Sequence, residues 1–424
     1  MKLRNQLLAL CCLLVFGAFG FLYVRTWVAP KTFGIILFVS DGMVARHLTA
    51  ARLYDGGATH RLNLESFPHL ALLRNSARDF AVPDAAAAAT ALATGEQVGH
   101  RNLAMDVSGK ALPSILELAH AKGRAVGLVT DGSLIAPAPA AFYAHASDAR
   151  NGEQIVQQFL GSARLDVILG GGARDFLPAS KGGSRKDGRD LLAELQGKGW
   201  ELVRTKAELE KASGYRTGPI AGFFSNDQLP FSNQIESGSQ QPSLADMVRR
   251  AIEFMQTRGQ GYVLVVDCSL ASTAAEGNEG ERLIAETLAL DRAIDTAVKY
   301  AGEKSLIIAV GKHATGGMNL NGYPLAQDHG TALLGINASG QPAITWATGP
   351  NGPPPPAPPA PPSDTAPAAP RIPAGARTEP AAFQAPSALN TAEDVVVIGR
   401  GAGAEKLQGF LDNTEVFRIL RDAL

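Results

Sequence analysis

The chain has 424 residues, of which 46% are hydrophobic and 19% are charged. This is the composition of a globular protein long enough for one large domain or two ordinary ones. Its 39 basic and 40 acidic residues nearly cancel. The protein therefore has no overall field of the kind that collects nucleic acid, and we exclude nucleic-acid binding.

The amino terminus carries an uncharged apolar run over residues 7–24, with basic residues on both sides. A segment of this kind is typical of exported proteins, and its length is close to the roughly 20 residues that span a hydrocarbon core. We predict that residues 1–28 export the body and anchor it in the membrane, at the periplasmic or extracellular face. Ala18 and Gly20 also form a small-x-small pattern, so a cleaved signal peptide is the alternative.

Beyond this segment, short apolar runs that stop at Gly or Asp alternate with amphipathic stretches. The runs predict strands that are buried on both faces, and the stretches predict helices between them. Such strands imply a mostly parallel central sheet flanked by helices, which is a three-layer α/β sandwich over residues 31–424. In such sheets the functional site lies beyond the carboxyl ends of the strands. The predicted strands are 31–43, 124–132, 165–172, 261–267, 304–311, 342–349 and 392–401, and the predicted helices are 81–95, 112–123, 153–163, 243–259 and 280–302.

One segment departs from this alternation of strands and helices. Residues 350–386 consist largely of Pro and Ala, and such a composition cannot bury enough apolar surface to offset the entropy of ordering the chain. We predict a disordered insertion within the domain. A docking motif for a partner that binds proline-rich segments is the alternative.

Several motifs, taken in order, resemble those of the alkaline phosphatase family over most of residues 33–348 and 387–420. They read FVSDGM, DAAAAATALATG, APAAFYAH, DVILGGG, KHATGGM and NTAEDVVV. The resemblance implies a serine nucleophile, two zinc ions, a magnesium ion and an arginine that binds the phosphoryl oxygens. Two metal ions suit phosphoryl transfer because one activates the nucleophile while the other holds the leaving oxygen.

The nucleophile motif is the first departure from the family. The family has a serine directly after an aspartate, and this chain has Asp84 followed by Ala85. Thr90 carries a hydroxyl five residues further along the same predicted helix. Because that distance exceeds one helical turn, Thr90 should face elsewhere and is a poor substitute nucleophile.

The resemblance also identifies the metal-binding positions, and only three of them keep a suitable residue. Asp41 and His313 match family ligands, and Asp267 replaces a glutamate. At the remaining positions Ala136 and Ala138 replace magnesium-side ligands, Ser272, Glu276 and Asn390 replace ligands of the first zinc, and Lys312 replaces an aspartate of the second. The position of the phosphate-binding arginine falls on Ala149, with Arg150 one residue away.

These replacements predict a catalytically inactive homologue that acts in binding or in structure. We expect no bound metal, since zinc sites ordinarily use three or four protein ligands. The alternative is a phosphomonoester hydrolase with a remodelled site, which would need zinc and magnesium. As partners we expect the membrane through the N-terminal segment, an anion or phosphorylated ligand in the site, and a second copy of the chain.

Lys312 offers a physical reason why Asp41 is retained. We predict that its ammonium group lies where the second zinc would be and neutralises Asp41. In the alternative arrangement Lys312 is exposed at a strand end and backbone amides satisfy Asp41.

Overall fold

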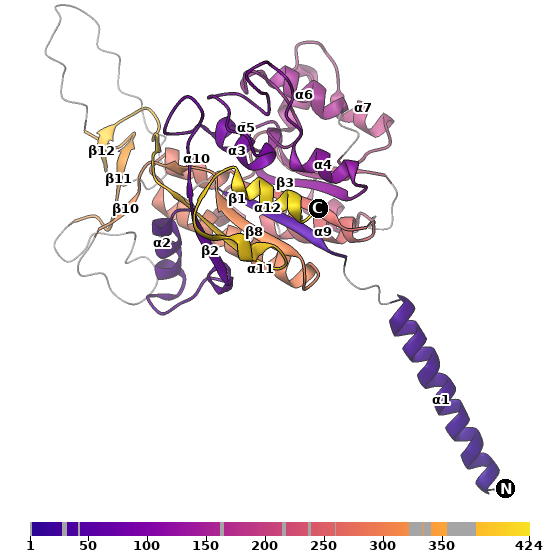
Figure 1. Cartoon of the computed structure of the whole chain (residues 1–424). Coiled ribbons are helices and arrows are strands. Elements are labelled where there is room, and N and C mark those ends of the chain that lie inside the picture. The colour runs from indigo at the N-terminus through magenta and orange to yellow at the C-terminus, as the bar shows by residue number, and fades with distance from the viewer. Residues whose placement is uncertain are drawn as a thin grey trace, which may run out of the picture. The chain divides into compact units, whose positions relative to one another are not determined.

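The computed structural model (Figure 1) divides the chain into two compact units, Met1–Thr32 and Phe33–Leu424. Each unit is described by itself. The described residues are 2–27, 32–40, 43–161, 165–213, 218–235, 239–258, 260–321, 334, 341–353 and 379–424.

The first unit contains one helix, α1 (Lys2–Trp27), which includes the apolar run over residues 7–24. Among the helices that the structure describes, none is long and apolar enough to cross a membrane. The predicted membrane anchor is therefore not confirmed.

The second unit is built on a ten-stranded sheet with the order β15-β2-β14-β8-β1-β7-β3-β4-β6-β5. The strands run parallel to one another except β14, which is antiparallel to both of its neighbours. This confirms the predicted mostly parallel sheet. The strand bounds are β1 Gly34–Ser40, β2 His69–Arg74, β3 Ala125–Ser133, β4 Val167–Gly171, β5 Glu201–Val203, β6 Ile220–Phe223, β7 Tyr262–Cys268, β8 Leu306–Gly311, β14 Val395–Arg400 and β15 Gln408–Asp412.

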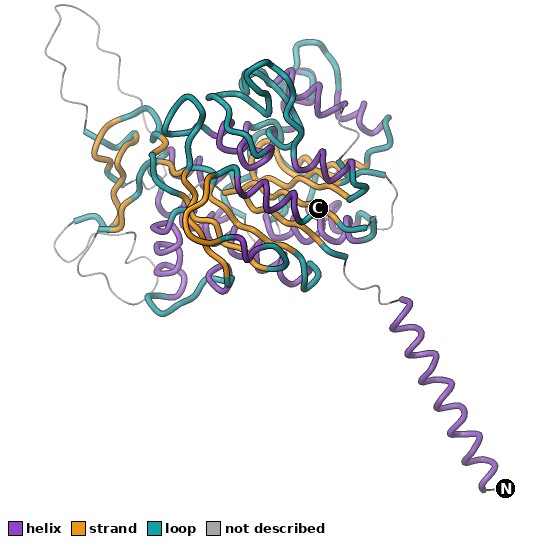
Figure 2. The backbone as a smooth tube through the Cα atoms, in the orientation of Figure 1, coloured by secondary structure: helices purple, strands orange, loops and turns teal. Residues whose placement is uncertain are grey.

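Helices cover both faces of the sheet, as the apolar strands require (Figure 2). Successive side chains of a strand point to opposite faces, so Leu37 and Val39 of β1 join one core cluster while Ile36 and Phe38 join the other. One face is covered by α3 (Ala85–Thr94), α4 (Ile115–Ala121), α5 (Pro137–Ala140), α6 (Gly152–Gly161), α7 (Leu191–Gly197) and α12 (Glu415–Asp422). The other is covered by α2 (Ala45–Gly56), α8 (Lys206–Lys211), α9 (Leu244–Gln256), α10 (Leu270–Glu276) and α11 (Gly280–Tyr300).

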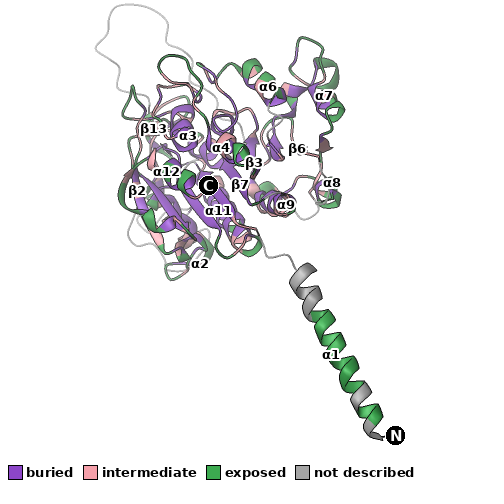
Figure 3. Ribbon diagram, turned by 45° about the vertical axis from the view of Figure 1, so that its right-hand side comes forward, coloured by how far each residue is buried: buried purple, intermediate pink, exposed green. Residues whose placement is uncertain are grey.

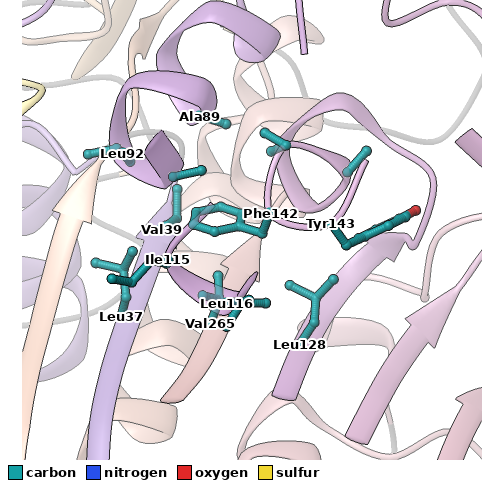
Figure 4. Close-up of a cluster of buried hydrophobic side chains, with 14 of the residues drawn as sticks. Leu37, Val39, Ala89, Leu92, Ile115, Leu116, Leu128, Phe142, Tyr143 and Val265 are labelled. Carbon is teal, nitrogen blue, oxygen red and sulfur yellow. The ribbon is translucent and has the colours of Figure 1, made fainter. Parts of the chain in front are cut away.

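The central strands are buried along their length (Figure 3). Figure 4 shows part of the core under α3, where Ala89 and Leu92 lie over Leu37 and Val39 of β1. Alanine has no side chain beyond Cβ, so the alanine run allows α3 to approach the sheet closely. The run also has the highest intrinsic helix propensity. The predicted helix over 81–95 is thus observed as α3.

The structure differs from the prediction around the proline-rich segment. Residues Ile344–Gly349, expected in the central sheet, form β11 of a separate three-stranded sheet with β10 (Asn319–Leu320) and β12 (Ala381–Gln384). The strand β12 belongs to the segment 350–386, so the end of that segment is ordered rather than disordered. Residues 354–378 lie outside the described residues.

Candidate functional site

The carboxyl ends of β1, β7 and β8 meet at one edge of the sheet. In the parallel register Ser40 of β1 pairs with Cys268 of β7 and with Gly311 of β8. The backbone N–H of Lys312, which follows β8, donates to the carbonyl oxygen of Ser40 at 2.9 Å. This alignment brings Asp267 and Lys312, which are far apart in sequence, to the same place.

Asp267 and Lys312 also share a face of the sheet. Val265 and Val310 both pack in the core cluster on the α3 side. Side chains two residues apart on a strand point to the same face, so Asp267 and Lys312 also point to the α3 side. The Lys312 Nζ lies 3.9 Å from Oδ1 of Asp267, and the two side chains are 3% and 0% exposed. The predicted exposed alternative for Lys312 is therefore wrong.

Two hydroxyl groups hold the other oxygen of Asp267. Oδ2 accepts hydrogen bonds from Thr130 Oγ1 at 2.6 Å and from the hydroxyl of Ser269. With the ammonium of Lys312 near Oδ1, both oxygens have polar neighbours from the protein itself. The protein itself thus supplies a cationic neighbour and two hydroxyl donors to this buried carboxylate, as buried charges require.

His313 lies next to Lys312 and is also buried. Its Nδ1 is 3.2 Å from the hydroxyl of Thr315, which donates to Oδ1 of Asn390 at 3.1 Å. Asn390 in turn donates its Nδ2 to the carbonyl oxygen of Pro83 at 3.0 Å. Asn390 thus connects β13 (Asn390–Thr391) to the segment before α3, at a position where the resemblance implies a zinc ligand.

The start of α3 is intact apart from the missing hydroxyl. Asp84 is the N-cap, and its Oδ1 accepts from the N–H of Ala87 at 2.8 Å. Its Oδ2 accepts from the N–H of Arg101 at 2.7 Å. Ala85 is the first residue of the helix and presents only a methyl group. The capping explains why the helix start persists without a nucleophile.

The other replaced positions supply few ligands. Ala136 is the N-cap residue of α5 and Ala138 is buried within it, and neither side chain has a polar atom. In α10, Ser272 donates its hydroxyl to Oε1 of Glu276 at 3.3 Å, and Glu276 is exposed.

Arg150 does not reach the Lys312–Asp267 pair. Its side chain is 70% exposed and forms an ion pair with Asp148 at 2.8 Å. This pair keeps the pKa of Asp148 low, at about 2, with the Arg150 hydrogen bonds as the main cause. Asp41, predicted as a retained ligand and as the partner of Lys312, lies outside the described residues.

The residues described here do not fit the two zinc ions and the magnesium ion that the resemblance implies. A cationic ammonium lies beside Asp267, and the Asn390 side chain is hydrogen-bonded to Thr315 and Pro83. Alanine side chains, which cannot bind a metal, occupy positions 85, 136 and 138. The described part of the chain contains no group of three or more His, Cys, Asp or Glu side chains that could hold a metal. The described residues of the site thus form a polar cluster around the Lys312–Asp267 ion pair.

Sequence reasoning missed several members of this cluster. Thr130 and Ser269 hold Asp267, and the side-chain amide of Asn75 donates to the carbonyl oxygen of Lys312. Thr130 stands near the end of the predicted strand 124–132, which is the signal that could have identified it. Asn75 follows β2, a strand that was not predicted.

Comparison with known proteins gives consistent results. The family model described as "Alkaline phosphatase" matches residues 33–424. Alkaline phosphatase 4 of Bacillus subtilis (strain 168) is 27% identical over 420 residues, covering 91% of this chain and 88% of the relative. Streptomycin-6-phosphate phosphatase of Streptomyces griseus is 29% identical over 339 residues, covering 68% of this chain and 75% of the relative.

The same fold is seen in solved structures. The alkaline phosphatase of the Antarctic bacterium TAB5 superposes with a TM-score of 0.70 at 22% identity, covering 93% of this chain and 98% of that one. The Thermus thermophilus alkaline phosphatase gives a TM-score of 0.71 at 23% identity, covering 93% and 92%. These likenesses establish the three-layer fold.

Proposed function

The chain belongs to the alkaline phosphatase family, and we propose that within it this protein is an exported, non-catalytic member that acts in binding or in structure. The observation that carries the proposal is the buried ion pair between Lys312 and Asp267, whose atoms lie 3.9 Å apart. A lysine ammonium supplies positive charge at a position where the family resemblance implies zinc. It offers no Lewis-acid centre that could activate a nucleophile.

The missing nucleophile supports the same conclusion. In another hydrolase, removal of a serine nucleophile lowers kcat by about a millionfold. Ala85 lacks the hydroxyl group, and Thr90 directs its hydroxyl to the carbonyl oxygen of Asn102 at 3.3 Å. The Thr90 hydroxyl is therefore hydrogen-bonded to the loop that follows α3, which weighs against Thr90 as a substitute nucleophile.

Export and membrane attachment are the second part of the proposal. The apolar run over residues 7–24, with basic flanks, supports export. We propose that α1 either stays as a membrane anchor or is removed as a signal peptide. Fractionation of cells that express the full chain, with mass spectrometry of its amino terminus, distinguishes the two.

The family resemblance also supports proposals for the ligand and for the oligomeric state of this protein. We propose that the strand-end site binds an anion or phosphorylated ligand beside Lys312, and that the chain forms a homodimer. Titration with inorganic phosphate checks the first, because Lys312→Met should abolish any saturable binding. Analytical ultracentrifugation of the full chain in detergent checks the second, since a single monomeric species would reject the dimer.

The test of the non-catalytic assignment is hydrolysis of p-nitrophenyl phosphate by the full chain, with zinc and magnesium added. We expect the same rate for the wild type and for the His313→Ala and Asp267→Asn variants, equal to the rate without protein. Metal-dependent turnover that both variants abolish would instead establish a remodelled phosphomonoester hydrolase.

A further inference from the structure

A second polar site lies on the opposite face of the sheet from Lys312. A cavity of about 260 Å³ is enclosed by the end of β3, the start of α9, the segment around η4 (Ser232–Gln234) and the middle of α11. Asp131 and Glu286 line it, and they are 5% and 4% exposed.

The alternation along β3 separates this cavity from the Lys312 cluster. Thr130 and Asp131 are consecutive residues, and their side chains point to opposite faces. Thr130 bonds Asp267 on the α3 side. Asp131 turns to the other side, where its Oδ1 accepts from the N–H groups of Ser269 at 2.6 Å and Leu270 at 3.2 Å.

Each carboxyl group in the cavity has one oxygen held by backbone and one that is not. Asp131 uses Oδ1 as described, and Glu286 uses Oε1 to accept from the N–H of Ser232 at 2.6 Å. Oδ2 of Asp131 and Oε2 of Glu286 take no part in these backbone hydrogen bonds, and the hydroxyl of Ser232 is a further donor beside Glu286. Two buried, fixed carboxyl groups therefore retain acceptor capacity toward the cavity.

The rest of the cavity wall is mainly apolar. Leu229, Leu244 and Leu270 line it, together with Ala289 of α11. Glu286, Ala289 and Arg292 are spaced three residues apart on α11, so they follow one side of the helix. Arg292 is exposed, and it therefore forms the solvent side of the cavity while Glu286 lies at its buried end.

We propose that this cavity binds a small organic ammonium ion, a primary amine with a short apolar body. The ammonium group lies between the open oxygens of Asp131 and Glu286, and the carbon chain packs against the leucines. An ammonium group has three donors and no acceptor, which suits carboxyl oxygens that take no part in the backbone hydrogen bonds. A buried charge of this kind needs opposite charge as well as hydrogen bonds, and the two carboxyl groups supply both.

Other ligand classes suit the cavity less well. An anion would lie beside two buried carboxyl groups, whose ionised forms repel it. Calcium takes six to eight oxygen ligands and magnesium needs near-octahedral coordination. The described residues contain no acidic group of three or more members suited to a metal ion.

The electrostatic state of the pair agrees with a cationic occupant. Burial raises the pKa of Asp131 well above its ordinary value, and the negative charges of Glu286 and Asp267 raise it further. Burial likewise raises the pKa of Glu286, and the hydrogen bonds from Ser232 and the positive charge of Arg292 offset part of this effect. A bound cation would offset this cost by favouring the ionised carboxylates.

The test is isothermal titration calorimetry of the full-length protein with n-butylamine, n-butanol and butyrate. We expect saturable binding of n-butylamine only. Asp131→Asn and Glu286→Gln should each weaken it by about tenfold or more, since a hydrogen bond to a charged group contributes roughly 1.5–3 kcal/mol. Glu281→Gln on the same helix lies outside the cavity lining and should bind as the wild type does.

Three results would overturn the proposal. The first is that n-butylamine does not bind to protein whose circular dichroism spectrum is native. The second is that n-butanol binds as tightly as n-butylamine, and the third is that both cavity variants bind n-butylamine with the wild-type affinity. Phosphatase assays do not enter this test, so its outcome is independent of whether the Lys312 site is catalytic.

Discussion

The ammonium nitrogen of Lys312 lies 3.9 Å from Oδ1 of Asp267, and both side chains are buried. The two residues come from the ends of β8 and β7, which are separated in the sheet by β1 alone. In the sequence-based prediction Lys312 neutralised Asp41. In the structure the described partner of Lys312 is Asp267, which the resemblance places on the magnesium side.

The first prediction concerns the stability that depends on this pair. Lys312→Met leaves Asp267 buried without its cation and should lower the free energy of unfolding by about 3–5 kcal/mol. Urea unfolding followed by circular dichroism measures the change. The double variant Lys312→Met/Asp267→Asn should recover much of the loss.

Lys299→Met provides the matched control for that experiment. Lys299 pairs with Asp295 on the surface of α11, where its side chain is 67% exposed. Exposed pairs contribute little because solvent screens them. An equal effect of the two methionine substitutions would show that the buried pair has no special role.

The second prediction concerns the retained aspartate before the alanine run. Asp84→Ala removes the side-chain cap of α3 and should destabilise the domain by about 1 kcal/mol or somewhat more. Asp84→Asn keeps an acceptor oxygen for Ala87 and should cost less. Thermal unfolding of the two variants distinguishes them, and identical melting temperatures would argue against a capping role.

The third prediction is that restoring the serine does not restore activity. Ala85→Ser returns a hydroxyl to the start of α3, but the positions where the resemblance implies metal ligands still hold Lys312, Ala136, Ala138 and Asn390. We expect no rise in p-nitrophenyl phosphate hydrolysis in added zinc and magnesium. A rise of several orders of magnitude would show that the metal site had remained functional.

The fourth prediction concerns the pH dependence of stability. Burial raises the pKa of Asp131 in the folded state, so the folded protein holds this proton more tightly than the unfolded chain. The protonated Asp131 therefore contributes fully to the free energy of unfolding below about pH 4, the ordinary pKa of an aspartate. This contribution is lost as the pH rises through the folded-state pKa.

Asp131→Asn removes this titration while keeping an acceptor for the backbone N–H groups of Ser269 and Leu270. The difference in melting temperature, variant minus wild type, should therefore increase from pH 4 to pH 8. A difference that stays constant or decreases over this range would contradict the raised pKa.

Much of the fold could be predicted because the buried strands are continuous apolar runs. The runs that became β1, β3, β4, β7 and β8 end in Gly or Asp and lie in a parallel sheet, as expected. The direction of β14 and the separate sheet around β11 could not be read from hydrophobicity, since both strands have similarly apolar runs. The strand β15 is largely exposed and has no such pattern.

The site was less predictable because its contacts join distant segments. Spacing within a motif identified Asp84 and Ala85 correctly as the start of a helix. The pairing of Lys312 with Asp267 depends on which strands are neighbours, and the bridge from Asn390 to Pro83 joins residues 307 positions apart in the sequence. Neither can be deduced from local sequence.

The metal content of the full-length protein after dialysis against zinc and magnesium tests the non-catalytic assignment most sharply, measured by inductively coupled plasma mass spectrometry. We expect zinc well below one ion per chain, with the same value in the His313→Ala and Asp267→Asn variants. Stoichiometric zinc that these substitutions remove would contradict this assignment.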